Sequence, residues 1–151
     1  KSTFHEASVR IPLIARWPER IPANEVSEAL VEIVDVFPTL VEAGEGKPST
    51  RCLGHSLWPL IRKERIEPRD WQVSEIVYGE ARTMLRSRRW KLAIDANDVA
   101  FMLYDLENDS QEQHNLVADP SARAEELRLR ECLASRLKEL RCGPGASRGG
   151  G

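Results

Sequence analysis

The 151-residue chain is 41% hydrophobic and 30% charged, a composition typical of folded globular proteins and not of disordered ones. Its formal net charge of −2 gives no general attraction to nucleic acid or to anionic membranes, and no apolar run approaches the roughly 20 residues needed to span a bilayer. The three cysteines and three histidines are scattered, so they indicate neither a disulfide framework nor a local metal site.

The first half of the chain predicts one strand and two short helical segments. Residues 9–17 combine β-branched and apolar side chains and are typical of a strand, with Pro12 near its start. Residues 34–44 follow a helical period, Asp35 stands where a cap is expected, and residues 56–61 predict a further helical turn. The apolar side chains of the first helix that are expected to face a core are Val36, Phe37, Leu40 and Val41.

The second half changes to the two-residue period of strands. Short runs of alternating character are separated by polar turns, which predicts an antiparallel meander of about three or four strands. The runs are residues 73–78, 83–86, 90–94 and 101–106. Trp90 and Tyr104 are expected to pack between this sheet and the helix that follows.

A long amphipathic helix follows the strands. Asp119 or Ser121 can cap its start, and Gly143 stands where its end is expected. Leucines recur on one face of this helix, so the stripe is expected to cover the sheet. They are Leu129, Leu133, Leu137 and Leu140. The glycine-rich residues 143–151 predict a disordered tail.

Four stretches, taken in order, resemble motifs of the sulfatases, a family of the alkaline-phosphatase-like superfamily. They are KSTFHEASVRIPLIARWPERIP, LVEIVDVFPTLVEAGE, LGHSLWPLI, and RTMLRSRRWKL followed by LYDLENDSQEQHNL. Their order and spacing agree with the family over roughly residues 1–140. His5 and Ser110 depart from the family pattern, which usually has Tyr and Pro there, but a serine can still hold a turn.

The resemblance implies an α/β fold, or α+β for this piece taken alone. Residues 1–66 would form the C-terminal end of the sulfatase catalytic domain, including the end of its parallel sheet. Residues 67–142 would form a subdomain in which a small antiparallel sheet is packed by the C-terminal helix, ahead of the tail at 143–151.

The resemblance also implies a chemistry. Sulfatases hydrolyse sulfate esters with a formylglycine made from Cys or Ser and with a divalent cation, normally calcium. Lys1 matches the family lysine that contacts the sulfate group and is the candidate catalytic and substrate-binding residue, since an ammonium group is a compact charge with three donors. His5 is a second candidate for contacting substrate. A link between Glu6 and Arg10 is expected to fix the loop that aims Lys1.

The nucleophile and the metal ligands are not expected in this chain. CLASR at residues 132–136 formally fits the maturation pattern of formylglycine, but it follows Lys1 and lies in the amphipathic helix, so we reject Cys132 as the precursor. Asp105, Asp109 and Glu112 are interpreted as turn residues, because a calcium loop needs about six or more oxygen ligands at ordered spacing. The basic hairpin residues have two interpretations, a lining of an anionic substrate cleft or a solvated strand face. They are Arg86, Arg89 and Lys91.

These observations favour the C-terminal fragment of a sulfuric ester hydrolase that acts on a sulfated small molecule or glycan. Because its nucleophile and metal would come from a segment before Lys1, we expect the chain alone to be catalytically silent. One alternative is a phosphatase or phosphonate monoester hydrolase of the same superfamily. Another is a non-catalytic interaction module from a truncated gene, which would expose an apolar face.

Overall fold

The computed structural model describes residues 3–64 and 69–142. Contacts divide the chain into two compact units, Lys1–Pro12 with Asp70–Arg136, and Leu13–Arg69 with Leu137–Gly151. The predicted division into domains near residue 67 stays a prediction. Among the described helices, none is long and apolar enough to cross a membrane.

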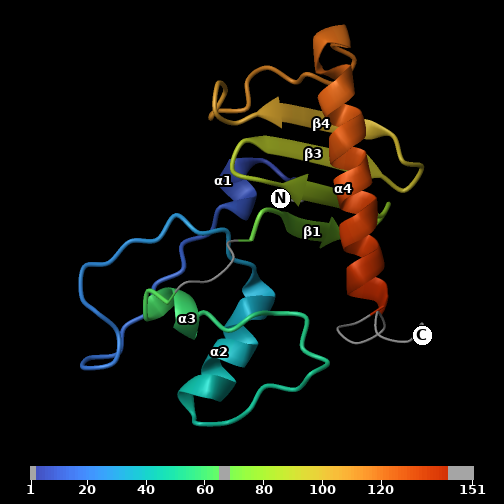
Figure 1. Cartoon of the computed structure of the whole chain (residues 1–151). Coiled ribbons are helices and arrows are strands. Elements are labelled where there is room, and N and C mark those ends of the chain that lie inside the picture. Colours follow the sequence, from blue (N-terminus) through green and yellow to red (C-terminus); the bar gives the residue numbers. More distant parts are fainter. Residues whose placement is uncertain (1–2, 65–68, 143–151) are drawn as a thin grey trace. The chain divides into compact units, whose positions relative to one another are not determined.

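The first unit contains a four-stranded antiparallel sheet with the strand order β1-β2-β3-β4 (Figure 1). The strands are β1 (Gln72–Ile76), β2 (Arg82–Arg86), β3 (Trp90–Asp95) and β4 (Ala100–Asp105). They follow one another as hairpins, because short polar turns join runs with the two-residue period. The predicted meander is therefore confirmed.

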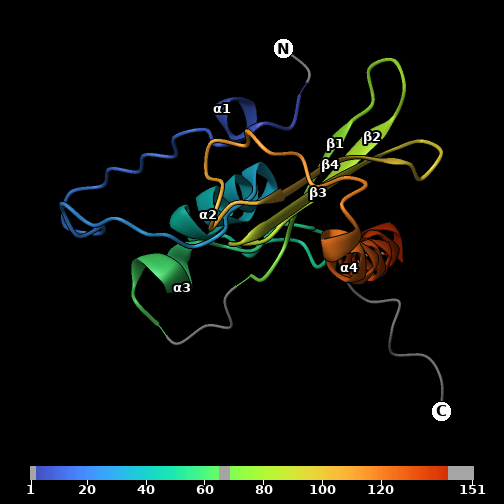
Figure 2. The same ribbon diagram turned by 90° about the horizontal axis from the view of Figure 1, so that it is seen from above.

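The sheet carries a helix on each face. Figure 2 shows α4 (Arg123–Cys142) along one face and the short α1 (Glu6–Val9) along the opposite face. Before α4, the Asp119 side chain accepts a hydrogen bond from the Ser121 backbone N–H at 2.8 Å, which caps η2 (Pro120–Ala122). Asp119 therefore caps the turn that leads into α4 and not α4 itself, whereas Gly143 and the tail lie outside the described residues.

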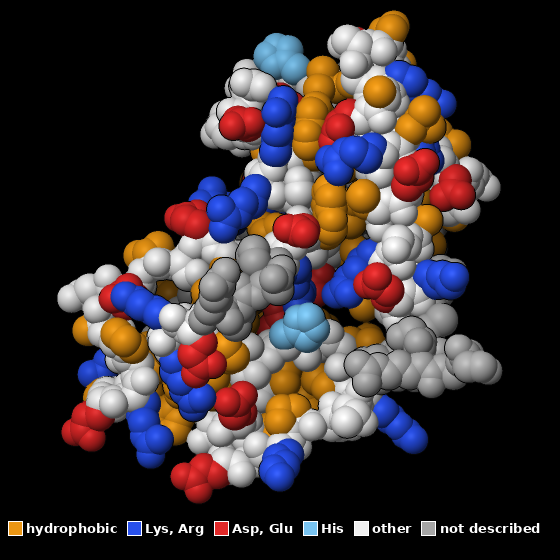
Figure 3. All heavy atoms as spheres, in the orientation of Figure 1, with side chains coloured by type: hydrophobic (Ala, Val, Ile, Leu, Met, Phe, Trp, Pro, Cys, Tyr) orange, Lys and Arg blue, Asp and Glu red, His pale blue; other side chains and the backbone are white. Residues whose placement is uncertain are grey.

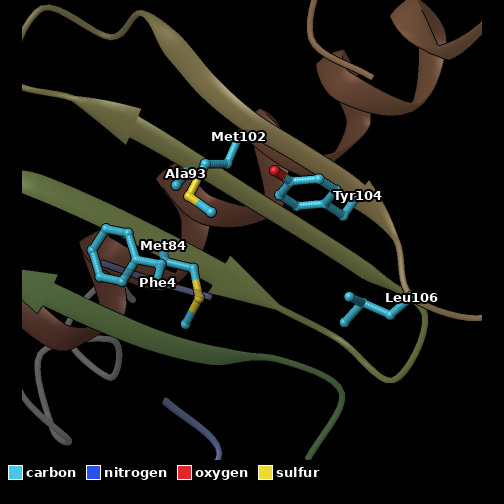
Figure 4. Close-up of a cluster of buried hydrophobic side chains, with 6 residues drawn as sticks. All are labelled: Phe4, Met84, Ala93, Met102, Tyr104 and Leu106. Atoms are coloured by element: carbon cyan, nitrogen blue, oxygen red, sulfur yellow. The ribbon is translucent and has the colours of Figure 1, made fainter. Parts of the chain in front are cut away.

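Two layers of apolar side chains line the two faces of the sheet. Leu85 pairs with Leu92, and Leu92 with Leu103, so all three share one face and are fully buried. On α4, Leu129 and Leu133 are buried, as the predicted stripe requires, while acidic and basic side chains are interleaved over the helix surface (Figure 3). The cluster on the other face consists of Phe4, Met84, Ala93, Met102, Tyr104 and Leu106 (Figure 4).

Tyr104 corrects one expectation. Its partner across the ladder is Lys91, and its ring centroid lies 5.9 Å from that of His5. Tyr104 therefore packs beside the N-terminal segment, on the face opposite α4. Both faces of this sheet are buried, so alternation alone does not tell which helix covers which row.

The second unit contains η1 (Ile33–Asp35), α2 (Val36–Ala43) and α3 (Trp58–Ile61). The helices predicted over residues 34–44 and 56–61 are confirmed with shorter bounds. An edge-on aromatic contact joins the exposed Trp17 to Trp58, and the two ring centroids lie 5.8 Å apart. Trp58 is buried, and its indole N–H donates to the Thr39 carbonyl at 3.1 Å.

Two expectations for the N-terminal half are wrong in this structure. Residues 10–17 form no strand within the described chain, whose sheet consists of β1 to β4. A strand needs a hydrogen-bonded neighbour, and Pro12 lacks a backbone donor. In α2, the side chains of Phe37 and Leu40 are exposed, so they face no core of this chain.

Candidate functional site

A buried ion cluster holds the N-terminal motif against the sheet. We define it as Glu6, Arg86, Lys91 and Glu112. The Lys91 side chain is 0% exposed, and its Nζ donates to the Phe4 carbonyl at 2.8 Å and to Glu112 Oε1 at 2.6 Å. The same nitrogen lies 2.6 Å from Glu6 Oε1. All three donors of the ammonium group therefore have partners within the protein.

Arg86 completes the neutralisation of Glu6. Its Nε and Nη2 donate to the two carboxylate oxygens at 2.9 and 3.0 Å, a bidentate geometry that fixes both groups. Burial alone would raise the pKa of Glu6, but the hydrogen bonds and charges of Arg86 and Lys91 outweigh it and lower this pKa to about 2. Glu6 is therefore ionised throughout the physiological pH range.

Glu112 fixes the backbone of the same segment. Its Oε2 accepts the Glu6 backbone N–H at 2.7 Å and lies 3.3 Å from His5 Nδ1. The Glu112 backbone has φ of 55°, a left-handed conformation that costs a non-glycine residue about 1–2 kcal/mol. The turn after β4 thus carries its carboxylate into contact with the N-terminal motif.

The sheet register brings the cluster together. Arg86 pairs with Lys91 across β2 and β3, and Lys91 pairs with Tyr104 across β3 and β4, so these three side chains form one row. The row lies on the α1 face, next to the apolar cluster. Burial raises the pKa of Tyr104, and the charges of Glu112 and Asp109 add to the effect, so Tyr104 stays a neutral neighbour of the carboxylates.

The structure corrects the expected partners of the basic and acidic residues. Glu6 pairs with Arg86 and Lys91, and Arg10 is exposed, so the predicted link between Glu6 and Arg10 is wrong. Lys91 neither lines a solvated strand face nor keeps a donor for an anionic ligand. Arg89 instead binds Asp105, through Nε at 3.0 Å and Nη2 at 2.7 Å. The burial of Lys91 had a signal in the sequence, because this lysine stands in an otherwise apolar run, WKLAI.

Among the predicted substrate contacts, only His5 can be placed. Its side chain is 43% exposed, with Nδ1 directed at Glu112 and the ring beside Tyr104. Lys1, the predicted catalytic residue, lies outside the described residues, and its role remains a prediction.

A second set of interactions joins two further motifs within the second unit. Asp35 is buried, and its Oδ1 accepts hydrogen bonds from the His55 backbone N–H and from Arg69, both at 2.8 Å. Arg69 also pairs with Glu32, whose backbone N–H donates to Asp35 Oδ2 at 2.8 Å. Asp35 therefore ties its helix to the LGHSL loop, beyond the capping role expected of it.

Thr39 adds a second link to the same loop. Its Oγ1 donates to the Asp35 carbonyl at 2.6 Å and accepts the Leu57 backbone N–H at 2.8 Å. Gly54 allows the close approach, since a Cβ there would lie 2.0 Å from the Val34 carbonyl oxygen. These contacts fix the loop structurally and leave Asp35 no free oxygen for a ligand.

The acidic side chains of the turn after β4 are all engaged within the protein. Within residues 3–64 and 69–142, no group of three His, Cys, Asp or Glu side chains is arranged to hold a metal ion. Asp105 is bound by Arg89, Asp109 accepts the backbone N–H groups of Gln113 and His114, and Glu112 belongs to the ion cluster. Cys132 lies inside α4. The three acidic side chains of this turn therefore serve the fold.

Asn115 fixes the edge of the sheet. Its Oδ1 accepts the backbone N–H groups of Leu103 and Val117 at 3.0 and 3.1 Å, and its Nδ2 donates to the Phe101 carbonyl at 2.8 Å. The LYDL and HNL segments are therefore joined through one amide side chain.

Comparison with known proteins agrees with this arrangement. A family described as "N-sulphoglucosamine sulphohydrolase, C-terminal" matches residues 1–142. The chain is 27% identical to the ulvan-active sulfatase of Formosa agariphila, over 91% of this chain and 35% of that protein.

Two solved structures share the fold. A protein solved with its substrate D-glucosamine-2-N,6-O-disulfate has a TM-score of 0.75 and 20% identity, over 89% of this chain and 29% of that one. A phosphonate monoester hydrolase from Silicibacter pomeroyi has a TM-score of 0.70 and 26% identity, over 82% of this chain and 28% of that one. The chain thus spans about a third of the length of these relatives or less. It belongs to the C-terminal family of the N-sulphoglucosamine sulphohydrolases and has the fold of that part of the sulfatases, in the alkaline-phosphatase-like superfamily.

Proposed function

We propose that this chain is the C-terminal part of a sulfuric ester hydrolase whose catalytic centre is completed by residues outside the chain. The family match over residues 1–142 and the sulfatase relatives support this proposal. The formylglycine nucleophile and calcium would be contributed by the rest of the polypeptide. The substrate class is a sulfated small molecule or glycan.

The observation that carries the proposal is the anchoring of the N-terminal motif by the ion cluster. Lys91 holds the Phe4 carbonyl, and Glu112 holds the Glu6 backbone N–H. Lys1 precedes Phe4 by three residues, so covalent geometry limits the separation of their α-carbons to about 11 Å. Anchoring of Phe4 and Glu6 therefore limits the region that the Lys1 side chain can reach, as repeated contact with a sulfate group would require.

In this proposal Lys1 neutralises sulfate oxygens and the charge that develops on the leaving oxygen. A positioned cation in a site that excludes water stabilises the transition state more than the free substrate. His5 is the second substrate contact. Glu112 engages its Nδ1, which leaves Nε2 as the ring nitrogen for hydrogen bonding with the ester.

The isolated chain is expected to be inactive. Among the described residues, no three His, Cys, Asp or Glu side chains are grouped so that they could hold a metal ion, and Cys132 lies within a helix. Exposed apolar side chains of the second unit, including Ile14, Phe37 and Leu40, fit a piece that is covered by further protein. The non-catalytic module also explains this exposure, and activity of the longer polypeptide separates the two.

The test is an assay of the longest natural polypeptide that contains residues 1–142, beside the isolated chain. With added calcium, we expect the longer protein to hydrolyse an aryl sulfate and the isolated chain to show background rates only. Lys1→Ala should lower kcat/KM about 100-fold or more, whereas the exposed Lys47→Ala should not. Hydrolysis by the isolated chain, or full activity of Lys1→Ala, would contradict the proposal.

A second candidate is a phosphonate monoester hydrolase, favoured by the similarity to the Silicibacter pomeroyi enzyme. It shares the scaffold, and the nucleophile that separates the two activities is outside this chain. A phosphonate monoester in the same assay decides between them. Faster turnover of the phosphonate than of the sulfate ester would favour the second candidate.

A further inference from the structure

The ion cluster has no net formal charge, which distinguishes it from the groups that would contact a sulfate ester. It contains two cations, Arg86 and Lys91, and two carboxylates, Glu6 and Glu112, so its formal charges cancel. Each donor of Lys91 is used, and Arg86 is bidentate to Glu6 with its Nη1 on the Ser87 carbonyl at 3.0 Å. With its charges balanced and every Lys91 donor used, the cluster presents no net positive charge to an anion. Its contacts instead act on the backbone of one segment.

That segment is the one that leads to Lys1. The cluster holds it through main-chain groups, since Lys91 binds the Phe4 carbonyl and Glu112 binds the Glu6 N–H. Main-chain contacts fix the path of the chain whatever the side chains do. Two independent elements make them, β3 for Lys91 and the turn after β4 for Glu112. Loss of either contact would therefore loosen the segment without exposing the sheet core.

We propose that Lys91 and Glu112 are positioning residues, which hold the backbone of Phe4 and Glu6 and thereby keep Lys1 within reach of the sulfate group. This inference rests on the proposed function. Neither residue touches substrate. Glu112 in addition engages Nδ1 of His5, so a single carboxylate orients both the backbone of the motif and the ring of the second substrate contact.

Glu112→Gln is the most specific test of the positioning role. It keeps the size of the side chain and leaves Lys91 paired with Glu6, so no buried charge loses its last partner. Asp105→Asn is the matched control, since it also converts a buried carboxylate paired with a basic side chain, in this case Arg89, into an amide within the first unit. Asp105 makes its contacts with Arg89 and with residues 107 and 108, away from the N-terminal motif.

The experiment compares both variants in the longest natural polypeptide, with an aryl sulfate and well below the thermal midpoints. We expect Glu112→Gln to lower kcat about 10- to 100-fold with a smaller change in KM, and Asp105→Asn to stay within about threefold of the parent. Equal losses in both variants, or no loss in Glu112→Gln, would overturn the positioning role. Absence of hydrolysis by the parent protein would instead reject the proposed function.

Hydrogen exchange at the Glu6 amide tests the anchoring without any activity. In Glu112→Gln this amide should exchange at least about tenfold faster than in Asp105→Asn, because its acceptor has lost its charge. Restoring a carboxylate with Glu112→Asp should recover part of the protection. Unchanged exchange at Glu6 in Glu112→Gln would show that Glu112 does not hold the segment, and would overturn the proposal even if the activity fell.

Discussion

Replacement of Glu6 by glutamine should remove much of the acid sensitivity of the first unit. The folded pKa of about 2 lies below the ordinary value of 4.5, and the Glu6 side chain is only 17% exposed. At about 1.4 kcal/mol per pH unit, this difference corresponds to about 3 kcal/mol of stability. Because the folded pKa is depressed, this contribution is fully present above about pH 4.5 and is lost as the pH falls toward 2.

Native-state hydrogen exchange of the β3 amides measures the effect in the first unit by itself. The protected Leu92 and Ala93 lie on this central strand, so their exchange reports unfolding of the sheet. We expect Glu6→Gln to lower the free energy of opening by about 3 kcal/mol near pH 7 and to differ little from the parent near pH 2. The difference between the two proteins should shrink steadily across that interval.

Arg10→Gln is the control. It tests whether Arg10, the partner expected from the sequence, contributes to the stability that Glu6 provides. Arg10 is exposed, whereas Arg86 and Lys91 surround the Glu6 carboxylate. The Arg10 variant should therefore follow the parent at every pH. An effect of Arg10→Gln as large as that of Glu6→Gln, or an unchanged pH dependence in Glu6→Gln, would refute the assignment of the partners.

Two further substitutions test the structural links of the motifs. Gly54→Ala places a Cβ 2.0 Å from the Val34 carbonyl oxygen, so the loop must move and lose its bonds to Asp35 and Thr39, at a cost of about 2–4 kcal/mol in urea unfolding. Gly44→Ala, whose Cβ would meet its nearest atom at 3.6 Å, should cost much less, and equal losses would argue against the clash. Asn115→Ala should cost about 1–3 kcal/mol and speed exchange of the Leu103 amide, and an unchanged rate there would contradict its bond to Asn115.

The sheet was predictable from the sequence because its strands pair with their neighbours along the chain. Alternation and polar turns are local properties, and they located β1 to β4. The strand expected at residues 9–17 depended instead on a neighbour that the described chain does not supply. Phe37 and Leu40 are a second example, because both are exposed. An apolar stripe predicts that a helix face is covered, but it does not identify the element that covers it.

The ion cluster was only partly predictable, because its contacts are remote in the sequence. A carboxylate at residue 6 suggested a guanidinium partner, and Arg10 was expected because it is close in the sequence, whereas the observed partner is Arg86. Lys91 was expected to line a substrate cleft or a solvated strand face, although a lysine in an otherwise apolar strand is also compatible with a buried cation that has acidic partners. Nothing local pointed to Glu112, whose turn sequence resembles that of an ordinary surface loop. The expected roles of Lys1 and His5 depended on family resemblance and stay predictions.

The ion cluster also explains why the separated motifs occur together. Glu6 and Arg86 are 80 residues apart, and the Glu6 amide and Glu112 are 106 apart. Leaving a buried charge without any partner typically costs about 3–5 kcal/mol, so each charge of the cluster needs at least one of the opposite sign beside it. The buried Asp35 likewise depends on hydrogen bonds from the His55 backbone N–H and from Arg69. The motifs are therefore joined physically by two separate sets of buried charges, one in each unit, and these links would be needed even if the chemistry of the site differed.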